Sequence, residues 1–448
     1  MVMNQGFQQY SRVAVLGAGE SGVAAAKLLA AEGVSVTVVD AASPDALRAR
    51  AADLAAAGIG LRCGSETLEG IHEYQRAVLS PGIDPATPLV RAFVSAGIEM
   101  VGELELAFER CACPVVAITG TNGKTTTTQL VDTMFNAAGV RSVACGNIGP
   151  AFSARVSESR EWGVATVEAS SFQLETVRTF HPKVAVWLNF APDHLDRYPS
   201  IEEYRSAKLR IFENLDESDW AVVNARDPLP VLKSKVLRFS AFESGADFEW
   251  VDGTICFRGQ PVLAMADTHL RGAHNAENLM AALGVGFAWG LDWKTMAAAL
   301  STYRALPHRC EWVRNLDGVD YVNDSKATNL DALEKALQSE TRPVILIAGG
   351  KDKGFEFESV TELVAKRCRA AVLIGEMAAR IEASWGASLP CRRAATFRES
   401  VLFARELARP GDVVLLSPGT SSFDMFQSYA DRGNQFRSIV QSLSSSEL

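Results

Sequence analysis

Short apolar runs rich in β-branched residues alternate with alanine- and leucine-rich stretches along nearly the whole chain. Alternation of this kind predicts strands and helices in turn, and therefore α/β layers built on mainly parallel sheets. A more hairpin-like section at 236–270 and two helices around 274–306 interrupt the pattern. The expected strands cover residues 13–17, 34–40, 115–119, 162–170, 183–190, 219–225, 342–350, 370–375 and 411–419.

Chain length divides this pattern into domains. At 448 residues the chain is too long for one hydrophobic core. The strands fall into three blocks, and we expect domains at 1–102, 103–305 and 306–448. The prediction is an α/β protein of three domains, each with a mainly parallel sheet flanked by helices.

Composition and charge narrow the class of protein. Hydrophobic residues make up 48% and charged residues 22% of the chain, which is ordinary for a globular protein and argues against long disorder. The net charge of −9, without a long basic run, disfavours a general nucleic-acid binder, whose surface must be positive. The N-terminus has no apolar signal core, and glycine and charge break the apolar stretches elsewhere. We therefore expect a cytoplasmic protein that does not enter a membrane.

The eight cysteines are scattered, and none forms a CxxC pair. Cys111 and Cys113 stand too close in sequence for a usual zinc knuckle, and no second pair supports one. We expect buried or idle thiols in a reducing cytosol.

The stretch PVVAITGTNGKTTTTQL, residues 114–130, resembles a phosphate-binding loop with the wrong spacing. A Walker A loop would place its first glycine at 118, where Ile118 stands, and the glycine here is Gly120. An apolar strand, a turn over Gly120–Gly123 and a helix N-terminus nevertheless direct backbone N–H groups and a positive dipole end at an anion. Lys124 adds a charge for phosphates and Thr125 a hydroxyl for Mg²⁺. The alternative is an ordinary strand-to-helix turn with a surface lysine; we predict a shortened phosphate loop.

An earlier glycine loop fits the dinucleotide fingerprint GxGxxG, with Gly17, Gly19 and Gly22, and with Asp40 ending the next strand. By spacing alone this loop binds NAD, another nucleotide diphosphate, or nothing. Glu20 is an awkward charge to place beside a pyrophosphate.

Three polar residues in the second block are candidates for a functional role. Glu168 and His194 each follow an apolar strand, at the edge where open α/β sheets collect ligands, so we predict that they bind Mg²⁺. Ser200 and Glu203 match a capping box for a helix whose apolar stripe contains Lys208. From the pattern alone, Lys208 is expected to extend its ammonium group to water, with burial and a special task as the alternative.

Two further loops of the third block, 349–354 and 417–424, also follow apolar strands, and their lysines and hydroxyls suit a small anionic substrate. Thr328 and Asp331 could cap the helix after NDSKATN, although that reading leaves Asp324 and Lys326 unexplained.

Taken together, these motifs resemble the Mur ligases, the amide-forming ligases of peptidoglycan precursor synthesis. TGTNGKTTT is similar to the family's shortened ATP loop, and the resemblance continues in order through EASSFQLE, NFAPDHLDRY, HNAENLMAA, LPHRCE, NDSKATN and SPGTSSFD, from about residue 13 to 437. NDSKATN resembles the member that adds D-glutamate, and the DNPR-type signature of the diaminopimelate-adding member is absent. The resemblance implies a Rossmann-like N-terminal domain, a P-loop ATPase-like central domain and a Rossmann-like C-terminal domain.

The resemblance also implies a reaction. The L-alanine carboxylate of UDP-MurNAc-L-Ala would take the γ-phosphate of ATP, and the amine of D-glutamate would then attack the acyl phosphate and release phosphate. The implied cofactors are ATP and two Mg²⁺ ions, the implied partners are these small molecules, and we expect a monomer.

Residue roles follow from the same resemblance. Catalytic roles fall to Lys124, His194 and Lys208, and the Mg²⁺ ligands would be Thr125, Glu168, His194 and a carbamylated Lys208. ATP would contact Gly120, Thr121, Asn122, Gly123, Lys124, Thr125, Thr126, Asn278, Arg309 and Asp324. The UDP-sugar would contact Gly19, Glu20, Ser21, Asp40, Gly82 and Asn147. D-Glutamate would contact Thr328, Lys353, Ser422 and Tyr429, while Lys326 matches the motif without a defined role. The chain departs from the family at Asp40-Ala41-Ala42, where a hydroxyl and an arginine often follow the strand.

Two other classes compete with this interpretation. An NAD-dependent oxidoreductase would use the first glycine loop and leave the second one idle. A nucleotide-binding scaffold would bind ATP without turnover.

Overall fold

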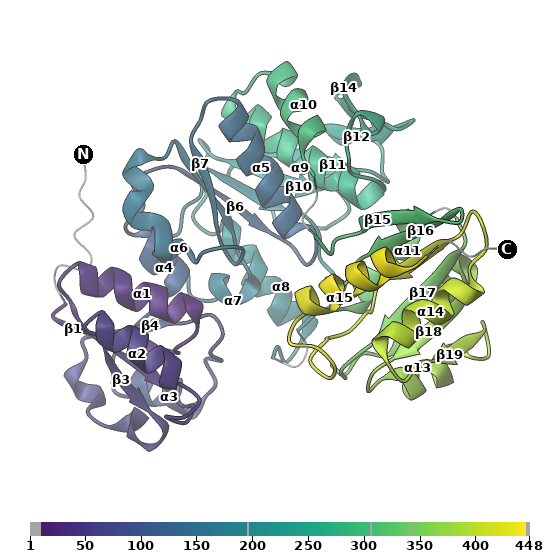
Figure 1. Ribbon diagram of the computed structural model, residues 1–448. Helices are drawn as coiled ribbons and strands as arrows, with labels where there is room; N and C mark the ends of the chain where they lie inside the picture. Colours follow the sequence, from purple (N-terminus) through teal and green to yellow (C-terminus); the bar gives the residue numbers. More distant parts are fainter. Residues whose placement is uncertain (1–9, 195–196, 305–306, 341, 445–448) are drawn as a thin grey trace. The chain divides into compact units, whose positions relative to one another are not determined.

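The computed structural model describes residues 10–194, 197–304, 307–340 and 342–444 (Figure 1). These residues divide into two compact units. The first unit consists of the described residues of Met1–Phe190, Arg197–Ala264 and Glu277–Ser301. The second unit consists of the described residues of Ala191–Asp196, Met265–Ala276 and Thr302–Leu448. The expected boundary at 305 and 306, and most of the N-terminal segment expected to lack a signal core, lie outside the described residues. The domain limits therefore stay a prediction. Over the residues described, no helix combines the length and the apolar character needed to cross a bilayer.

Five parallel strands form the first sheet of the first unit. In chain order its elements are β1 (Arg12–Leu16), α1 (Glu20–Ala31), β2 (Ser35–Asp40), α2 (Arg48–Ala56), β3 (Gly60–Cys63), β4 (Arg76–Leu79), α3 (Pro88–Ser95) and β5 (Glu99–Gly102). The strand order is β3-β2-β1-β4-β5. Leu29 of α1 and Leu54 of α2 pack on one face of the sheet, and Phe93 of α3 packs on the other. The order reverses at β1, so the glycine loop after β1 lies where such sheets bind nucleotides.

A nine-stranded sheet forms the rest of the first unit. Its strands are β6 (Val115–Thr119), β7 (Ser142–Gly146), β8 (Val164–Glu168), β9 (Val184–Trp187), β10 (Trp220–Asn224), β11 (Lys235–Ser240), β12 (Phe248–Val251), β13 (Thr254–Phe257) and β14 (Gln260–Ala264). Its helices are α4 (Glu103–Phe108), α5 (Lys124–Ala137), α6 (Phe152–Arg155), α7 (Ser171–Leu174), α8 (Ile201–Leu209), α9 (Ala273–Trp289) and α10 (Trp293–Thr302). The order is β14-β13-β12-β11-β10-β9-β6-β8-β7, which puts β6 between β9 and β8.

The section expected to be hairpin-like is only partly so. β12, β13 and β14 are antiparallel, whereas β11 pairs parallel to β10 and extends the main sheet. The apolar face predicted for the helix after the phosphate loop is buried at Leu130, Val131, Met134 and Phe135.

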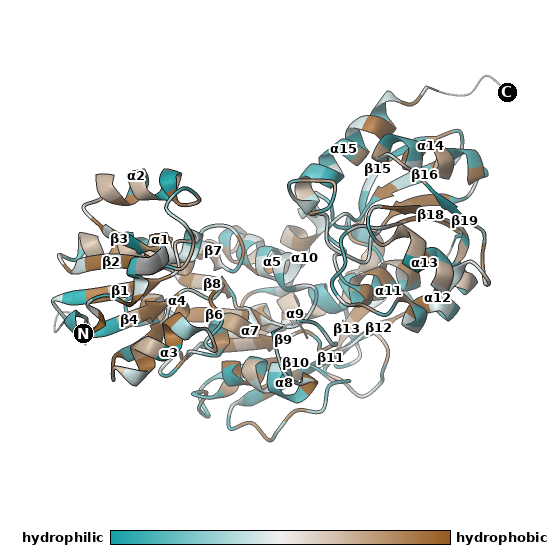
Figure 2. Cartoon of the chain, turned by 90° about the horizontal axis from the view of Figure 1, so that it is seen from below, coloured by the Kyte–Doolittle hydropathy of each residue, from teal (hydrophilic) through white to brown (hydrophobic). Residues whose placement is uncertain are grey.

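The second unit is built on a six-stranded sheet. Its elements are β15 (Glu311–Leu316), β16 (Val319–Asn323), α11 (Leu330–Ser339), β17 (Val344–Gly349), α12 (Thr361–Arg367), β18 (Cys368–Ile374), α13 (Ala378–Trp385), β19 (Cys391–Arg393), α14 (Phe397–Leu407), β20 (Val413–Leu416) and α15 (Tyr429–Ser442). Its order is β15-β16-β20-β17-β18-β19, with only β15 antiparallel to its neighbour. Hydrophobic residues gather on the strands and polar residues on the outer helices (Figure 2). The prediction of mainly parallel sheets flanked by helices is confirmed.

Candidate active site

The predicted phosphate loop joins the end of β6 to the start of α5. Gly120 and Gly123 adopt φ angles of 152° and 85°, which side-chain-bearing residues rarely adopt. Asn189, two residues beyond the end of β9, holds the residues between these two glycines: Thr121 N–H donates to Asn189 O, and Asn122 N–H donates to Asn189 Oδ1, each at 2.9 Å. Asn189 Nδ2 donates in return to Asn122 O at 3.0 Å. Asn189 therefore fixes the loop, a role that the sequence analysis missed.

Two lysines direct their charge at one carbonyl of this loop. Lys124 Nζ donates to Gly120 O and to Thr121 O, both at 2.9 Å. Lys208 Nζ donates to Gly120 O at 2.9 Å from α8, on a distant part of the chain. Two ammonium groups beside the N-terminus of α5 make a strongly positive position, suited to a bound polyphosphate.

Asn278 of α9, the predicted adenine contact, packs against the loop at Gly123. A Cβ atom added to Gly123 would lie 2.2 Å from Asn278 Oδ1, so only glycine fits here. Thr127 Oγ1 donates to Asn278 Oδ1 at 3.3 Å. The loop and α9 are therefore packed directly against each other.

Glu168 ends β8, the strand next to β6, and is buried. Asn147 Nδ2 donates to Glu168 Oε1 at 2.8 Å. Glu168 Oε2 is buried and has no hydrogen-bond partner among the described residues. A buried carboxylate oxygen without a partner is costly unless a ligand satisfies it, and a hard cation such as Mg²⁺ would do so. Thr125, in the first turn of α5, is also buried.

Lys208 is buried, with 1% of its surface exposed. Ser200 Oγ accepts the Glu203 N–H at 3.1 Å and so begins α8 as predicted. The helix brings the Lys208 ammonium group to Gly120 O and to 4.7 Å from the centroid of the Tyr204 ring. The expectation from pattern alone, that Lys208 extends to water, is wrong because the phosphate loop covers it.

The first glycine loop has the expected close packing. Gly17 has a φ of 102°, and a Cβ at Gly22 would lie 2.0 Å from Gly17 O. The Asp40 carboxylate accepts the Ala18 N–H at 2.7 Å and the Ala42 N–H at 2.8 Å. Asp40 therefore ties the loop to the end of β2. Of the other predicted UDP-sugar residues, Gly19, Glu20 and Ser21 lie where α1 begins, and Gly82 follows β4.

In the second unit, a hollow of about 350 Å³ is lined by Asp193, His194 and Lys353 together with apolar side chains such as Leu330 and Phe355. Asn329 Nδ2 donates to Asp193 Oδ2 at 2.8 Å. His194, a predicted metal ligand, belongs to this unit, whereas Thr125, Glu168 and Lys208 belong to the first. The pairing of His194 with Lys208 at a metal therefore stays a prediction.

Three loops meet at one edge of the second unit's sheet, because β16, β20 and β17 are neighbours. Asp324, after β16, accepts the Cys310 N–H at 3.1 Å and the Ser417 hydroxyl at 3.0 Å. Burial raises the pKa of the Asp324 carboxyl to about 7, against the opposing effect of these hydrogen bonds and of Arg309. Asp324 and Arg309, both predicted to contact ATP, therefore lie near each other.

The predicted D-glutamate residues are distributed over the same edge. Lys353 follows β17, Thr328 precedes α11, Ser422 follows β20 and Tyr429 begins α15. Asn329 caps α11 by accepting the Ala332 N–H, so the alternative in which Thr328 caps this helix is wrong. The Lys326 ammonium lies 4.0 Å from the centroid of the Tyr429 ring. Of these predicted residues only Lys353 lines the hollow.

The sequence analysis also made no prediction for Arg432, which has a structural role in the second unit. It is 1% exposed, and its guanidinium donates to Ser325 Oγ and Ser325 O, each at 2.9 Å. Burial lowers the pKa of Arg432 to about 10. It binds the loop after β16 to α15, and an arginine in an amphipathic helix carries no sequence signal of that role.

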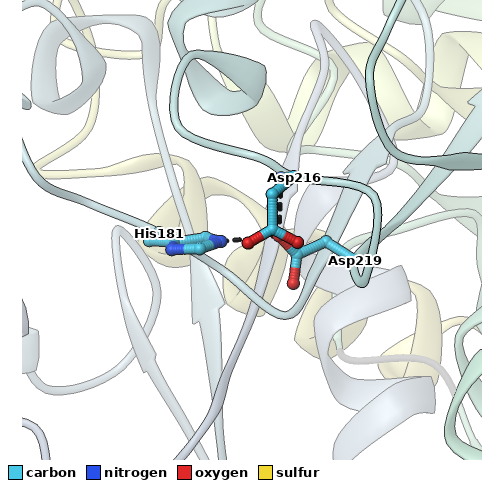
Figure 3. A group of neighbouring side chains, drawn as sticks. All are labelled: His181, Asp216 and Asp219. Carbon is cyan, nitrogen blue, oxygen red and sulfur yellow. Dashed lines mark hydrogen bonds and ion pairs between the residues drawn. The ribbon is translucent and has the colours of Figure 1, made fainter.

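Outside these sites, His181, Asp216 and Asp219 are the one group of at least three potential metal ligands within the described residues (Figure 3). Asp219 Oδ2 lies 2.6 Å from His181 Nε2 and accepts the Asp216 N–H at 2.8 Å. Lys183 Nζ donates to Asp219 Oδ1 at 3.2 Å. Protein donors already satisfy the Asp219 carboxylate, and the group therefore lacks the character of a metal site. Its hydrogen bonds instead join the starts of β9 and β10.

Comparisons with known proteins agree along the chain. Residues 11–102 match the family model described as Mur ligase MurD-like, N-terminal domain. Residues 118–286 match the Mur ligase middle domain, and residues 308–419 match the Mur ligase glutamate ligase domain.

Curated relatives are similar over nearly their whole length. A protein of Pelotomaculum thermopropionicum named UDP-N-acetylmuramoylalanine--D-glutamate ligase is 42% identical, over 96% of this chain and 98% of its own. The protein of the same name from Geobacter metallireducens is 41% identical, over 97% and 98%.

Solved structures share the fold at low identity. UDP-N-acetylmuramate-alanine ligase MurC from Thermotoga maritima has a TM-score of 0.62 at 17% identity, over 97% of this chain and 100% of that one. The MurF ligase from Thermotoga maritima, solved in complex with ADP, has a TM-score of 0.58 at 16% identity, over 91% and 95%.

Proposed function

The chain belongs to the Mur ligase family, and on that premise we propose that it joins D-glutamate to the L-alanine carboxyl group of UDP-N-acetylmuramoyl-L-alanine while ATP is converted to ADP and phosphate. The enzyme would act in the cytoplasm, as a monomer, in peptidoglycan precursor synthesis. The near-full-length identity to relatives named for this reaction supports the choice of substrates. The observation that carries the chemistry is the phosphate loop, where Lys124 and Lys208 both donate to Gly120 O.

The reaction needs activation because a carboxylate is a poor electrophile toward an amine. Transfer of the γ-phosphate of ATP to the L-alanine carboxylate gives an acyl phosphate with a good leaving group. The amine of D-glutamate then attacks the carbonyl carbon, and phosphate leaves. The reactants are all anions, so Lys124 and the N-terminus of α5 would offset their mutual repulsion and hold the phosphates in line.

The side chains around the loop fit a Mg²⁺ ion, because Glu168 Oε2 is buried without a hydrogen-bond partner among the described residues. Thr125 and Glu168 would hold one ion, and His194 with Lys208 would hold a second. Bound Mg²⁺ neutralises phosphate charge and favours its transfer. Asn147 orients the Glu168 carboxylate through the 2.8 Å hydrogen bond to Oε1, which leaves Oε2 for the metal.

We propose that Lys208 works as a carbamate. Its burial supports this role, since burial favours the neutral amine, the only form that reacts with CO₂. Its contacts with Gly120 O and the Tyr204 ring favour an ammonium group instead. Carbamate formation would therefore require the Lys208 side chain to exchange these contacts for the metal ions.

For the substrates, we propose that Lys353 binds a carboxylate of D-glutamate in the hollow of the second unit, with Thr328, Ser422 and Tyr429 on the neighbouring loops. The convergence of these loops at one sheet edge supports this assignment. Asn278 would bind adenine, Arg309 a phosphate and Asp324 the ribose of ATP. The first glycine loop would bind the uridine diphosphate at Gly19, Glu20 and Ser21, with Gly82 and Asn147 on the sugar side and Asp40 supporting the loop through Ala18.

The decisive experiment measures phosphate release from ATP by the purified full-length protein with Mg²⁺, UDP-MurNAc-L-Ala and a panel of amino acids: D-glutamate, L-glutamate, D-aspartate and D-alanine. We expect phosphate only when the nucleotide and D-glutamate are both present, with a product heavier by one glutamyl residue. Hydride transfer with NAD and no phosphate would favour an oxidoreductase. ATP binding without turnover on any amino acid would favour a scaffold.

A separate experiment tests the carbamate. Lys208→Ala is expected to be inactive and to regain activity with added short carboxylic acids, which can occupy the place of the carbamate. If the variant is folded by circular dichroism but is not rescued, the carbamate proposal is refuted, while the proposed ligase function is not affected.

A further inference from the structure

A short linker joins α4 to β6, directly before the strand that leads into the phosphate loop. The side chain of Arg110 is paired with Glu32 of α1 at 2.6 Å. The Ala112 N–H donates to Ser159 Oγ at 3.0 Å, on the side of the nine-stranded sheet. The stretch Cys111–Cys113 therefore lies where the chain passes from one set of anchoring contacts to the other.

The two cysteines of this linker face each other. Cys111 Sγ and Cys113 Sγ are 3.5 Å apart, close to van der Waals contact. Cys111 Sγ also lies 3.3 Å from Cys113 O. Both residues are half-buried, whereas Cys145, which packs in the adjoining core, is fully buried. The linker thus holds two neighbouring thiols on half-buried residues, beside a third thiol on a buried residue.

The pair is suited to thiol–disulfide exchange. A hydrogen bond from the Cys113 thiol lowers the pKa of Cys111, so Cys111 is the better nucleophile of the two. Disulfide sulfurs are about 2.05 Å apart, so the two atoms must approach by about 1.5 Å. Rotation of the Cys side chains, with adjustment of the linker backbone, can supply that movement.

We propose that Cys111 and Cys113 form a redox-active dithiol that closes to an intramolecular disulfide by exchange with a low-molecular-weight disulfide. The Cys111 thiolate attacks one sulfur of the small disulfide, breaks its S–S bond and expels one thiolate. Cys113, losing its proton, then attacks Cys111 Sγ and expels the second small thiolate. Two protein thiols are oxidised, one small disulfide is reduced to two thiols, and the two protons that the protein thiols lose are taken up by the two expelled thiolates.

The disulfide would be readily reversible. Cysteines separated by one residue close a small ring, and such constrained disulfides are strained and more easily reduced than those of ordinary geometry. In a reducing compartment the pair would stay a dithiol and would oxidise only when the small-disulfide pool rises. Activity toward D-glutamate plays no part in this proposal, so it stands or falls separately from the proposed function.

The test incubates the folded full-length protein with oxidised glutathione, alkylates the remaining thiols and maps the tryptic peptides by mass. Cleavage after Arg110 and Lys124 releases residues 111–124, which contain Cys111 and Cys113 and no other cysteine. We expect neither cysteine of this peptide to be alkylated and its mass to be lower than that of the unalkylated dithiol peptide by two hydrogen atoms. Treatment with dithiothreitol should restore alkylation of both cysteines.

Matched variants complete the experiment. Cys113→Ser should trap a glutathione adduct on Cys111, Cys111→Ser should leave Cys113 largely alkylatable, and Cys256→Ser, at a half-buried thiol on β13, should oxidise like the wild type. The proposal is overturned if both thiols of the wild-type peptide stay alkylatable, if the wild type accumulates a stable glutathione adduct there, or if the cysteines cross-link between molecules.

Discussion

Replacing Gly123 by alanine tests the packing between the phosphate loop and α9. Gly123 has a φ of 85°, and an alanine Cβ there would lie 2.2 Å from Asn278 Oδ1. The substitution therefore has two costs, one from the backbone conformation and one from the collision. Left-handed backbone costs a non-glycine residue about 1–2 kcal/mol.

The collision is the larger effect on ATP binding. Carbon and oxygen atoms in contact are normally separated by more than about 3 Å, so the overlap is close to 1 Å. Asn278 is buried and receives the Thr127 hydroxyl, so it cannot turn aside without loss. Displacement of either the loop or Asn278 would misplace ATP, and a misplacement of about 1 Å can cost on the order of 100-fold in rate. We expect Gly123→Ala to lower kcat/KM for ATP by at least about tenfold, or about 1.4 kcal/mol.

Gly139 supplies the matched control. It lies just beyond the other end of α5, has a φ of 77°, and an added Cβ there would meet nothing within 4 Å. Gly139→Ala should therefore show the backbone cost alone, as a lower thermal midpoint with kcat/KM for ATP within roughly twofold of wild type. Phosphate release at varied ATP, with thermal unfolding of each variant, separates the two costs.

A double-mutant cycle decides the cause. In an Asn278→Ala background the collision is absent, so Gly123→Ala should add much less than it does in the wild type. If Gly123→Ala alone keeps kcat/KM for ATP within roughly twofold of wild type, or if its effect is equally large without the Asn278 side chain, the reasoning from packing is refuted.

Three other predictions concern individual side chains. Lys124→Ala should lower the rate of phosphate release by at least one to two orders of magnitude, on the scale of losing one preorganised electrostatic partner; a rate within twofold of wild type would contradict the assignment. Glu168→Gln should keep the hydrogen bond from Asn147 but raise the Mg²⁺ concentration for half-maximal rate by at least about tenfold, since a neutral amide binds the ion poorly; an unchanged Mg²⁺ titration would count against Glu168 as a ligand. The pKa of Asp324 is raised to about 7, so the folded state keeps a proton that the unfolded chain releases near pH 4. As the pH rises from about 4 to 7, this carboxyl therefore lowers the free energy of unfolding by up to about 4 kcal/mol. Unfolding of Asp324→Asn should lack that dependence when recorded between about pH 5 and pH 8, and parallel curves for the two proteins would show the assignment to be wrong.

Local patterns were sufficient to predict the strands that matter most to the site. The strand predicted at 115–119 is β6 (Val115–Thr119), and the predicted metal residue Glu168 is the last residue of β8. Buried parallel strands read as continuous apolar runs, and that signal needs no knowledge of their neighbours. Shorter or half-polar strands such as β3, β15 and β19 carry little of it and were missed.

The order of strands lies beyond such patterns. β20 comes last along the chain but lies between β16 and β17, which is why Ser417 reaches Asp324 at 3.0 Å. No property of either segment alone indicates that contact. Asn189 and Arg432 were missed for the same reason, since their roles depend on loops far away in sequence that the sheet order brings to them.

Lys208 shows how a correct local pattern leads to a wrong local conclusion. The stripe is buried at Tyr204 in α8 and at Ile211 just beyond its end, on either side of the lysine, whereas Ile201 at the start of α8 is exposed. Extension of a lysine to water assumes that water lies within reach of the side chain. Here the space is occupied by Gly120, whose carbonyl accepts the ammonium hydrogen at 2.9 Å. The pattern predicts which face of α8 is buried, but only the fold determines which segment covers that face. In this protein the covering segment is the loop proposed to bind ATP.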